Sequence, residues 1–511
     1  MSKSLLRSTS AVSSMTLLSR VLGFLRDMIA AHLFGATAEV DAFLVAFKIP
    51  NFMRNLFAEG ALQQSFIPVL SEYHQKKTLA EIKLFTSHLA GCLSAILIPF
   101  CVLGMMAGAP VAINLFAPGF NLEPHRFQLA VQMLHITFPY IFFLSLTAFM
   151  ASVLNTFGNF LAPAFTSSIL NICMIVAAIF LSPFLAVPVE SQAYAVLVAG
   201  ILQIVFLAPY LYKLRLLTWP RLAWHDPGVK RVLKLMVPSI FGASIGQISI
   251  LVGTIFASFL PVGSIAWLYF SERLAYFPLG VIAVALATVI LPHLSRQHAS
   301  QSFEEFKNAF AWGIRCNLLV GTLASITLWF MATPIIITLF KYGKFTATDV
   351  FMTGKSTVAY AVGLQAFMLN KLLVNGFFAK QNIKTPVKIG VITVVINIIL
   401  DIVLIFPLAH AGLALASSLS QWCNTGILFY MLHKQGVYKL ERHWLKFLIQ
   451  LFFANAIAAL IFTYAAHNTA QWVAWHATER FIYLFLWLIA GTLAYLACLW
   501  VAGIRKKHIR T

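Results

Sequence analysis

Long apolar stretches separated by short polar loops run along the whole chain. Fourteen such stretches follow one another, and each approaches the roughly 20 residues that a helix needs to cross a hydrocarbon core about 30 Å thick. They lie near residues 15–36, 39–71, 82–107, 126–154, 161–185, 191–212, 235–258, 263–294, 308–340, 346–379, 386–407, 410–433, 444–466 and 480–504. The alternation of period two that is typical of a membrane β-barrel is absent, and helices satisfy the backbone inside lipid. The pattern therefore predicts an all-α polytopic membrane protein with 14 transmembrane helices.

Composition supports the same class of protein. Hydrophobic residues make up 60% of the 511 positions and charged residues only 10%. A soluble protein of this size normally has about a quarter of its residues charged. No segment resembles a separate soluble domain.

The formal net charge of +20 could indicate nucleic-acid binding, but its distribution favours another explanation. Most of the 36 Lys and Arg residues fall in loops on one side of the predicted membrane. The other side has only Arg126, Lys341, Lys344, Lys355 and Arg480. By the positive-inside rule the basic side is cytoplasmic, which places both termini in the cytoplasm. Topology and contact with anionic lipids account for the charge, so no nucleic-acid partner is expected.

An internal repeat indicates a chain made of two related halves. Residues 57–71 align without gaps on residues 281–295, so that Pro68 corresponds to Pro292, and Pro50 roughly corresponds to Pro278. Each copy ends the second helix of a six-helix block. Transporters built from repeats place the substrate site between the halves, often at helices interrupted by proline or glycine. Two six-helix halves plus two further helices is the economical architecture, although chance similarity of two helix ends remains an alternative.

Basic residues inside the predicted spans indicate function, because a charge at the bilayer centre costs about 2.5–3.5 kcal/mol. They are Arg20, Arg26, Lys48, Arg54, Arg273, Arg315 and Lys371. The acids available to neutralise them are Asp27, Asp41, Glu59, Glu272 and Asp401. Residues seven apart return to nearly the same helix face, which places Arg20 with Asp27 and Asp41 with Lys48. Any single arginine could instead form a structural salt bridge between helices. The arginines taken together favour a bound anion that several of them contact from different sides.

Guanidinium groups match phosphate and carboxylate oxygens in two-pronged geometry, so pyrophosphate is the natural ligand. The spans around these residues are strongly apolar, with 45 phenylalanines in the chain. An amphiphile whose tail stays in lipid while its head group crosses fits both features.

Several motifs resemble one known family. The segments at residues 14–27 (SMTLLSRVLGFLRD), 41–54 (DAFLVAFKIPNFMR) and 57–61 (FAEGA) look like the opening of the MurJ (MviN) family of lipid II flippases. Residues 271–274 (SERL) and 342–345 (YGKF) look like its later motifs, and the resemblance runs essentially from end to end. It implies peptidoglycan biosynthesis in a bacterial cytoplasmic membrane.

The resemblance also implies the fold of the MOP exporters: two pseudo-symmetric six-helix bundles around a V-shaped central cavity, plus two C-terminal helices beside a groove for a polyprenyl tail. On this basis we expect an N-terminal bundle over residues 1–220 and a second bundle over 221–440. Residues 441–511 would form helices 13 and 14 and a basic cytoplasmic tail.

Carried over by position, the resemblance implies that Arg20, Arg26, Arg54 and Arg273 bind diphosphate and head group. Asp41 matches an essential carboxylate on the second helix, and it and Glu272 are expected to pair or gate, as are Asp27 and Glu59. Two departures reduce the expected charge. Asn55 stands where some members have a basic residue, and Tyr276 where they have an acid.

A sodium site is a further expectation and the only cofactor candidate. Asn397 and Asp401 are four residues apart on one span, and Leu413 and Ser417 have the same spacing on the next, so each pair faces one direction. The arrangement is similar to a site in some members of the family, which also use an aspartate where this chain has Gly253. A polar contact between two helices is the equal alternative.

Three other functions compete. A multidrug antiporter of the same fold would need a cavity of acids and aromatics, whereas arginines are in excess here. A flippase for another polyprenyl-diphosphate-linked saccharide shares nearly every physical feature. A membrane enzyme such as a polyprenyl-phosphate transferase would need an Asp-rich metal motif, which the sequence lacks, so we expect a transporter and not an enzyme. Lipid II, membrane lipids and other cell-wall synthesis proteins are the expected partners.

Overall fold

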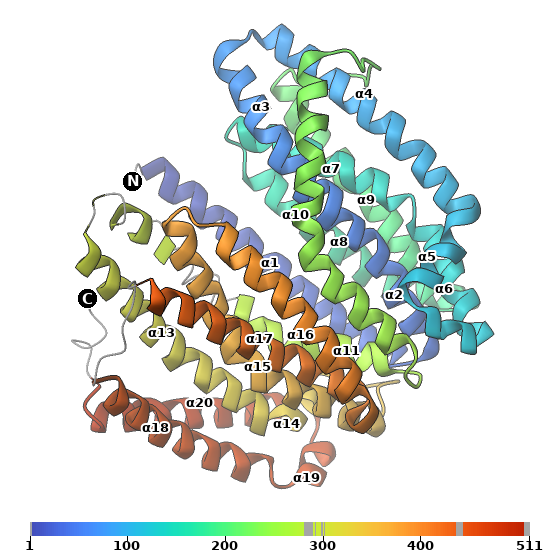
Figure 1. Cartoon of the computed structure of the whole chain (residues 1–511). Helices are drawn as coiled ribbons and strands as arrows, with labels where there is room; N and C mark the ends of the chain where they lie inside the picture. Colours follow the sequence, from blue (N-terminus) through green and yellow to red (C-terminus); the bar gives the residue numbers. More distant parts are fainter. Residues whose placement is uncertain are drawn as a thin grey trace. The chain divides into compact units, whose positions relative to one another are not determined.

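The structure is a computed structural model that describes residues 3–280, 290–291, 293–297, 300, 302–435 and 443–504. For residues 3–13, 57–60, 241–243, 245–246 and 443 it describes the backbone alone. Every regular element within these ranges is a helix (Figure 1). The chain divides into two compact units, Met1–Gly263 and Ser264–Thr511.

The described residues of the first unit form ten α-helices, several of which are joined by short π- and 3-10 segments. They are α1 (Lys3–Phe34), α2 (Ala38–Met53), η1 (Arg54–Leu62), α3 (Gln63–Lys76), α4 (Leu79–Leu103), η2 (Gly104–Gly108), α5 (Ala109–Phe116), η3 (Pro118–Leu122), α6 (Pro124–Thr137), α7 (Tyr140–Thr156), α8 (Leu161–Val176), η4 (Ala177–Leu181), η5 (Ser182–Phe184), α9 (Glu190–Lys213) and α10 (Pro227–Ser258). Helix α1 packs on α8, α2 on α6, and α7 and α8 on α9, while α10 packs on α3 and η1.

Aromatic side chains fill the core of this unit. The ring of Phe66 on α3 lies 5.0 Å from that of Phe149 on α7 and 5.9 Å from that of Phe85 on α4. Phe66, Phe85 and Leu154 are almost fully buried. Burial of such a side chain stabilises a fold by about 1.5–3 kcal/mol, and ring pairs contribute further. This cluster fixes α3, α4 and α7 as the frame on which α10 rests.

The second unit is also helical in its described part. Its helices are α11 (Ser264–Pro278), α13 (Phe303–Phe330), α14 (Ala332–Phe340), α15 (Ala347–Ala379), α16 (Lys384–Leu408), α17 (His410–Lys434), α18 (His443–Ala466), α19 (Thr469–Ala474) and α20 (Ala477–Val501). Helix α15 packs on α11, α13 and α17, and α16 packs along α17. Helices α18 and α20 pack on each other, with α18 also against α13.

Nine helical segments of the described chain are long and apolar enough to cross a bilayer. They are Leu79–Phe116, Pro124–Thr156, Leu161–Phe184, Glu190–Lys213, Phe303–Phe330, Ala347–Ala379, Lys384–Leu408, Trp444–Ala466 and Ala477–Val501. Most agree with the predicted spans to within a few residues, because an unbroken apolar run is a strong signal for a membrane helix. The chain is therefore a multi-pass membrane protein. The total of 14 helices and the pseudo-symmetry stay predictions.

The predicted second span, residues 39–71, is not one regular helix. Pro50 lies near the end of α2, and the backbone continues as the π-helix η1 before α3 begins. A proline cannot donate the N–H that its turn requires, so the hydrogen-bond register changes near it. Arg54 stands at the first position of this irregular segment.

The repeat and the two domain boundaries are predictions from the sequence. Residues 281–289 and Pro292, which form most of the second repeat copy, lie outside the described residues. The boundaries after residues 220 and 440 stay predictions. Helix α10, which follows the first of those boundaries, packs within the compact unit that ends at Gly263.

Candidate functional site

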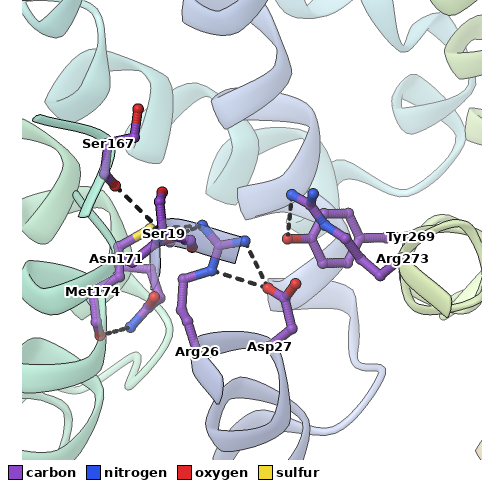
Figure 2. Close-up of polar contacts among 9 residues, drawn as sticks. Ser19, Arg26, Asp27, Ser167, Asn171, Met174, Tyr269 and Arg273 are labelled. Atoms are coloured by element: carbon purple, nitrogen blue, oxygen red, sulfur yellow. Dashed lines mark hydrogen bonds and ion pairs between the residues drawn. The ribbon is translucent and has the colours of Figure 1, made fainter. Parts of the chain in front are cut away.

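A buried arginine on α1 forms the best-defined polar cluster of the first unit (Figure 2). Arg26 is 6% exposed and Asp27 2%. The Nε and one terminal nitrogen of Arg26 donate to Asp27 Oδ1 at 2.9 and 2.7 Å. The other terminal nitrogen donates to Asn171 Oδ1 at 3.1 Å and lies 3.5 Å from Met174 Sδ. Because charged hydrogen bonds are about twice as strong as neutral ones, this arrangement fixes the guanidinium plane between α1 and α8.

Asn171 in turn is held in place by backbone carbonyls. Its Nδ2 donates to Ser19 O on α1 at 3.0 Å and to Ser167 O at 3.3 Å. A Cβ added to Gly23 would lie 3.5 Å from that same amide, in ordinary van der Waals contact, so Gly23 of α1 faces Asn171 of α8 directly. An asparagine such as this suggests a turn in sequence, yet it lies inside α8 and joins two helices.

A second buried pair joins α2 to α6. Arg126 donates to Asp41 Oδ2 at 2.7 Å, and the two side chains are 2% and 0% exposed. The N–H of Gly263 donates to the same oxygen at 2.7 Å. Arg126 also donates to Leu260 O at 3.4 Å, and its guanidinium lies 4.1 Å from the Phe120 ring centre. The pair therefore fixes the connection that follows α10 to the ends of α2 and α6.

The structure adds to what the sequence indicates about these charges. Arg126, which the sequence places with the loop residues of the less basic side, is a buried residue in the first turn of α6. Lys48 shares a helix face with Asp41, and its Nζ donates to Thr254 Oγ1 on α10 at 3.2 Å. Asp27 forms an ion pair with Arg26, its neighbour in sequence. Spacing along one helix thus gave the face of each charge but not its partner.

The other candidate arginines of the first unit, Arg20 and Arg54, are less buried than Arg26. Arg20 is half-buried and precedes Arg26 on α1 by about 9 Å along the helix axis. It forms no ion pair or hydrogen bond with any residue that the structure describes. Arg54 is half-buried at the start of η1, and neighbouring Asn55 donates to Gln247 Oε1 on α10 at 3.4 Å. The side chain of Glu59 lies outside the described residues.

The candidates of the second unit are on α11, α16 and α17. Arg273 is exposed, donates to the Tyr269 hydroxyl at 3.2 Å, and lies 4.9 Å from the centre of that ring (Figure 2). Glu272 is half-buried beside it.

The predicted sodium ligands lie on two helices that pack together. Asn397 and Asp401 on α16 are 5% and 2% exposed, Leu413 on α17 is buried, and Ser417 is half-buried. Asp401 forms no hydrogen bond or ion pair with a described residue, which is unusual for a buried carboxylate. Among the described residues no cluster of three His, Cys, Asp or Glu side chains could hold a metal ion.

Sequence reasoning missed three contributors to the first cluster and its support. Met174 contacts Arg26, Gln192 on α9 donates to Met174 O at 3.1 Å, and Asn171 accepts from Arg26. Asn171 and Gln192 are polar residues within or beside apolar spans. Their position could have indicated in the sequence that they contact another polar group, because a polar side chain in lipid normally has a partner.

The comparisons with known proteins agree with one another. The family model described as "Lipid II flippase MurJ" matches residues 30–483. A relative from Vibrio cholerae named "Probable lipid II flippase MurJ" is 40% identical, over 100% of this chain and 98% of its own length. A solved structure titled "Lipid II flippase MurJ, inward closed conformation" is 27% identical with a TM-score of 0.81, covering 98% of this chain and 99% of that one.

A more distant structure extends the fold comparison. An inward-facing multidrug transporter of the MATE family, in the MOP superfamily, has a TM-score of 0.68 at 14% identity, covering 83% of this chain and 97% of that one. That likeness concerns the fold alone. With the full-length match at 40% identity and the family model spanning most of the sequence, the chain belongs to the MurJ family of lipid II flippases.

Proposed function

We propose that this protein carries lipid II, the undecaprenyl-diphosphate-linked peptidoglycan precursor, from the inner to the outer leaflet of the bacterial cytoplasmic membrane. The names of its full-length relatives support this proposal. So does one structural observation: two buried carboxylates of the first unit, Asp27 and Asp41, are already engaged by Arg26 and Arg126. Half-buried Arg20 is left without an ion pair among the described residues, and such a charge favours an anionic ligand.

The proposed mechanism is alternating access. The arginines Arg20, Arg26, Arg54 and Arg273 bind the diphosphate, because guanidinium forks match its oxygens. Helices α18 and α20 supply exposed apolar side chains, among them Phe452 and Leu493, along which a polyprenyl tail can lie in lipid. Movement of these charges would make the cycle sensitive to membrane potential, by about 2.3 kcal/mol per elementary charge and 100 mV.

Both termini are proposed to face the cytoplasm, because the basic loops cluster on the side of the termini. Other cell-wall synthesis proteins are the proposed partners at the membrane. No covalent chemistry on the cargo is proposed.

Depletion of the protein in its host tests the function. We expect lipid II exposed at the outer leaflet to collapse, and wild-type protein supplied in trans to restore it. Persistent exposure after depletion, in a strain without another lipid II transporter, would contradict the cargo. A flippase for another polyprenyl-diphosphate-linked saccharide would then be favoured, and loss of export of cationic drugs alone would favour a multidrug antiporter.

We further propose that Na⁺ binds among Asn397, Asp401, Leu413 O and Ser417. The buried Asp401, without a described partner, fits a cation, and hard oxygen ligands suit Na⁺ better than they suit softer transition metals. The ion would neutralise the carboxylate and join α16 to α17.

Thermal unfolding of the purified protein tests this site. A ligand present at 100 times its Kd stabilises the folded state by about 2.7 kcal/mol, so NaCl should raise the unfolding temperature more than KCl at equal ionic strength. Asp401→Asn should remove the difference, whereas Glu304→Gln, at an exposed ion pair with Lys307, should retain it. Equal effects of both salts on the wild type would contradict the site.

A further inference from the structure

The segment that joins α9 to α10, residues 214–226, has an unusual surface for a loop. Tyr212 before it and Trp219 and Leu222 within it are 74%, 88% and 63% exposed. Exposed basic side chains alternate with them, namely Lys213, Arg215 and Arg221. None of these three cations forms an ion pair with a described residue.

Trp219, Arg221 and Leu222 are exposed although the backbone of their segment is held in place by hydrogen bonds to α4. The hydroxyl of Ser87 donates to Trp219 O at 2.6 Å, and the N–H of Arg221 donates back to Ser87 O at 3.0 Å. One turn later, a methyl group on Gly91 would overlap the backbone of Arg221, so the glycine creates the notch that allows this approach. The backbone therefore faces α4, which turns Trp219 and Leu222 outwards.

Both ends of the segment are fixed as well. After α9, Arg215 donates its N–H to Tyr212 O at 2.9 Å and Leu216 donates to Leu211 O at 3.0 Å, with Arg215 at φ 58° and Leu216 buried. This is the Schellman helix ending, with an arginine where glycine is usual.

At the other end, Asp226 begins α10. Its Oδ1 accepts from the N–H of Gly228 at 2.8 Å, and its Oδ2 lies 2.8 Å from His88 Nδ1 on α4. A segment with this surface is prepared for a partner, since its backbone is already ordered before binding.

The position of the segment identifies the partner. Helix α9 is long and apolar enough to cross a membrane and ends at Lys213, and Ser87 and Gly91 lie within the apolar helical segment that begins at Leu79. The loop therefore lies at the bilayer surface on that side. Tryptophan and tyrosine prefer this depth, where the ring meets apolar chains and the polar edge meets head groups, and nearby Lys and Arg attract anionic lipids.

We propose that residues 212–222 form a preformed anchor on the membrane surface: Trp219 and Leu222 insert among the acyl chains, and Lys213, Arg215 and Arg221 bind the phosphates of anionic glycerophospholipids. The anchor includes none of the described hydrogen-bond partners of Arg26 and Asp41 and does not depend on the transported cargo. It would hold the α9–α10 connection at one depth while the helices on either side move.

Quenching of tryptophan fluorescence by brominated lipids tests the anchor in the full-length protein. Two vesicle preparations contain phosphatidylcholine with three parts in ten phosphatidylglycerol and no lipid II. Both carry the same amount of bromine, which is on phosphatidylcholine in one preparation and on phosphatidylglycerol in the other. The difference between wild type and Trp219→Phe isolates the signal of Trp219. We expect quenching by both lipids and, because each basic residue near an anionic surface adds severalfold to the binding, about twofold or greater quenching by brominated phosphatidylglycerol.

Variants separate the two parts of the proposal. Replacing Lys213, Arg215 and Arg221 together by glutamine should make the two lipids equal quenchers. Gly91→Ala should displace the loop and weaken both signals, whereas Gly390→Ala, where a Cβ meets nothing within 4 Å, should not. Trp329, 44% exposed on α13, serves as a lipid-facing reference.

Either of two results would overturn the proposal. If neither brominated lipid quenches Trp219, the loop does not insert, and a protein partner becomes the better explanation of its surface. If phosphatidylglycerol gives no advantage over phosphatidylcholine in the wild type, the basic residues do not bind anionic head groups.

Discussion

Substitution of Arg26 by glutamine is expected to abolish lipid II exposure at the outer leaflet. The change removes the cation that pairs with Asp27 at 2.7 Å and the donor to Asn171, and it leaves a carboxylate that is 2% exposed. Breaking a buried charge pair by removing one partner costs about 3–5 kcal/mol. The measurement is lipid II accessibility in depleted cells that express each variant, normalised to the amount of protein in the membrane.

Two controls separate charge from geometry. Arg26→Lys keeps the positive charge but cannot fork between Asp27 and Asn171, so we expect partial activity. Lys76→Gln changes an exposed cation on α3 and should leave activity intact. Full activity of Arg26→Gln at normal abundance would show that the buried arginine does not act on the cargo.

The Asp41–Arg126 pair should dominate the stability of the first unit. Asp41→Asn keeps an acceptor for the Gly263 N–H but leaves Arg126 buried without its carboxylate. Each single change, Asp41→Asn or Arg126→Met, should lower the free energy of unfolding by about 3–5 kcal/mol. The double change should cost clearly less than the sum, because it leaves no uncompensated charge.

Unfolding in mixed micelles measures the four members of this cycle. The exposed pair of Lys77 and Glu81, with side chains 48% and 45% exposed, provides the matched control. Exposed pairs typically contribute less than about 1 kcal/mol, so Lys77→Gln should have a small effect. Additive losses in the double variant, Asp41→Asn with Arg126→Met, would mean that the two side chains do not stabilise each other.

The helices could be predicted closely from the sequence because their signal is local. The predicted spans 191–212, 386–407 and 444–466 correspond to α9, α16 and α18 within two residues at each end. Apolar runs decide such elements without knowledge of the neighbouring helices. The break of the second span into α2, η1 and α3 was not predicted, although Pro50 marks its position.

Partners of the buried charges could not be predicted in the same way, because they are distant in sequence. Arg126 lies 85 residues after Asp41 and appears beside Pro124 and His125, in a polar stretch typical of a loop. Asn171 lies 145 residues after Arg26. Helical periodicity orders residues on one helix and carries no information about which helix packs against it. The sequence therefore predicted that the charges are functional candidates, and only the structure pairs them.

The central claim, that this chain itself moves lipid II between leaflets, is tested most directly with purified protein in vesicles that contain labelled lipid II in one leaflet. The account predicts that wild-type protein transfers the label to the other leaflet, and that Arg26→Gln, incorporated to the same level, does not exceed vesicles without protein. Transfer by the wild type no faster than in protein-free vesicles, under a membrane potential and with Na⁺ present, would contradict it.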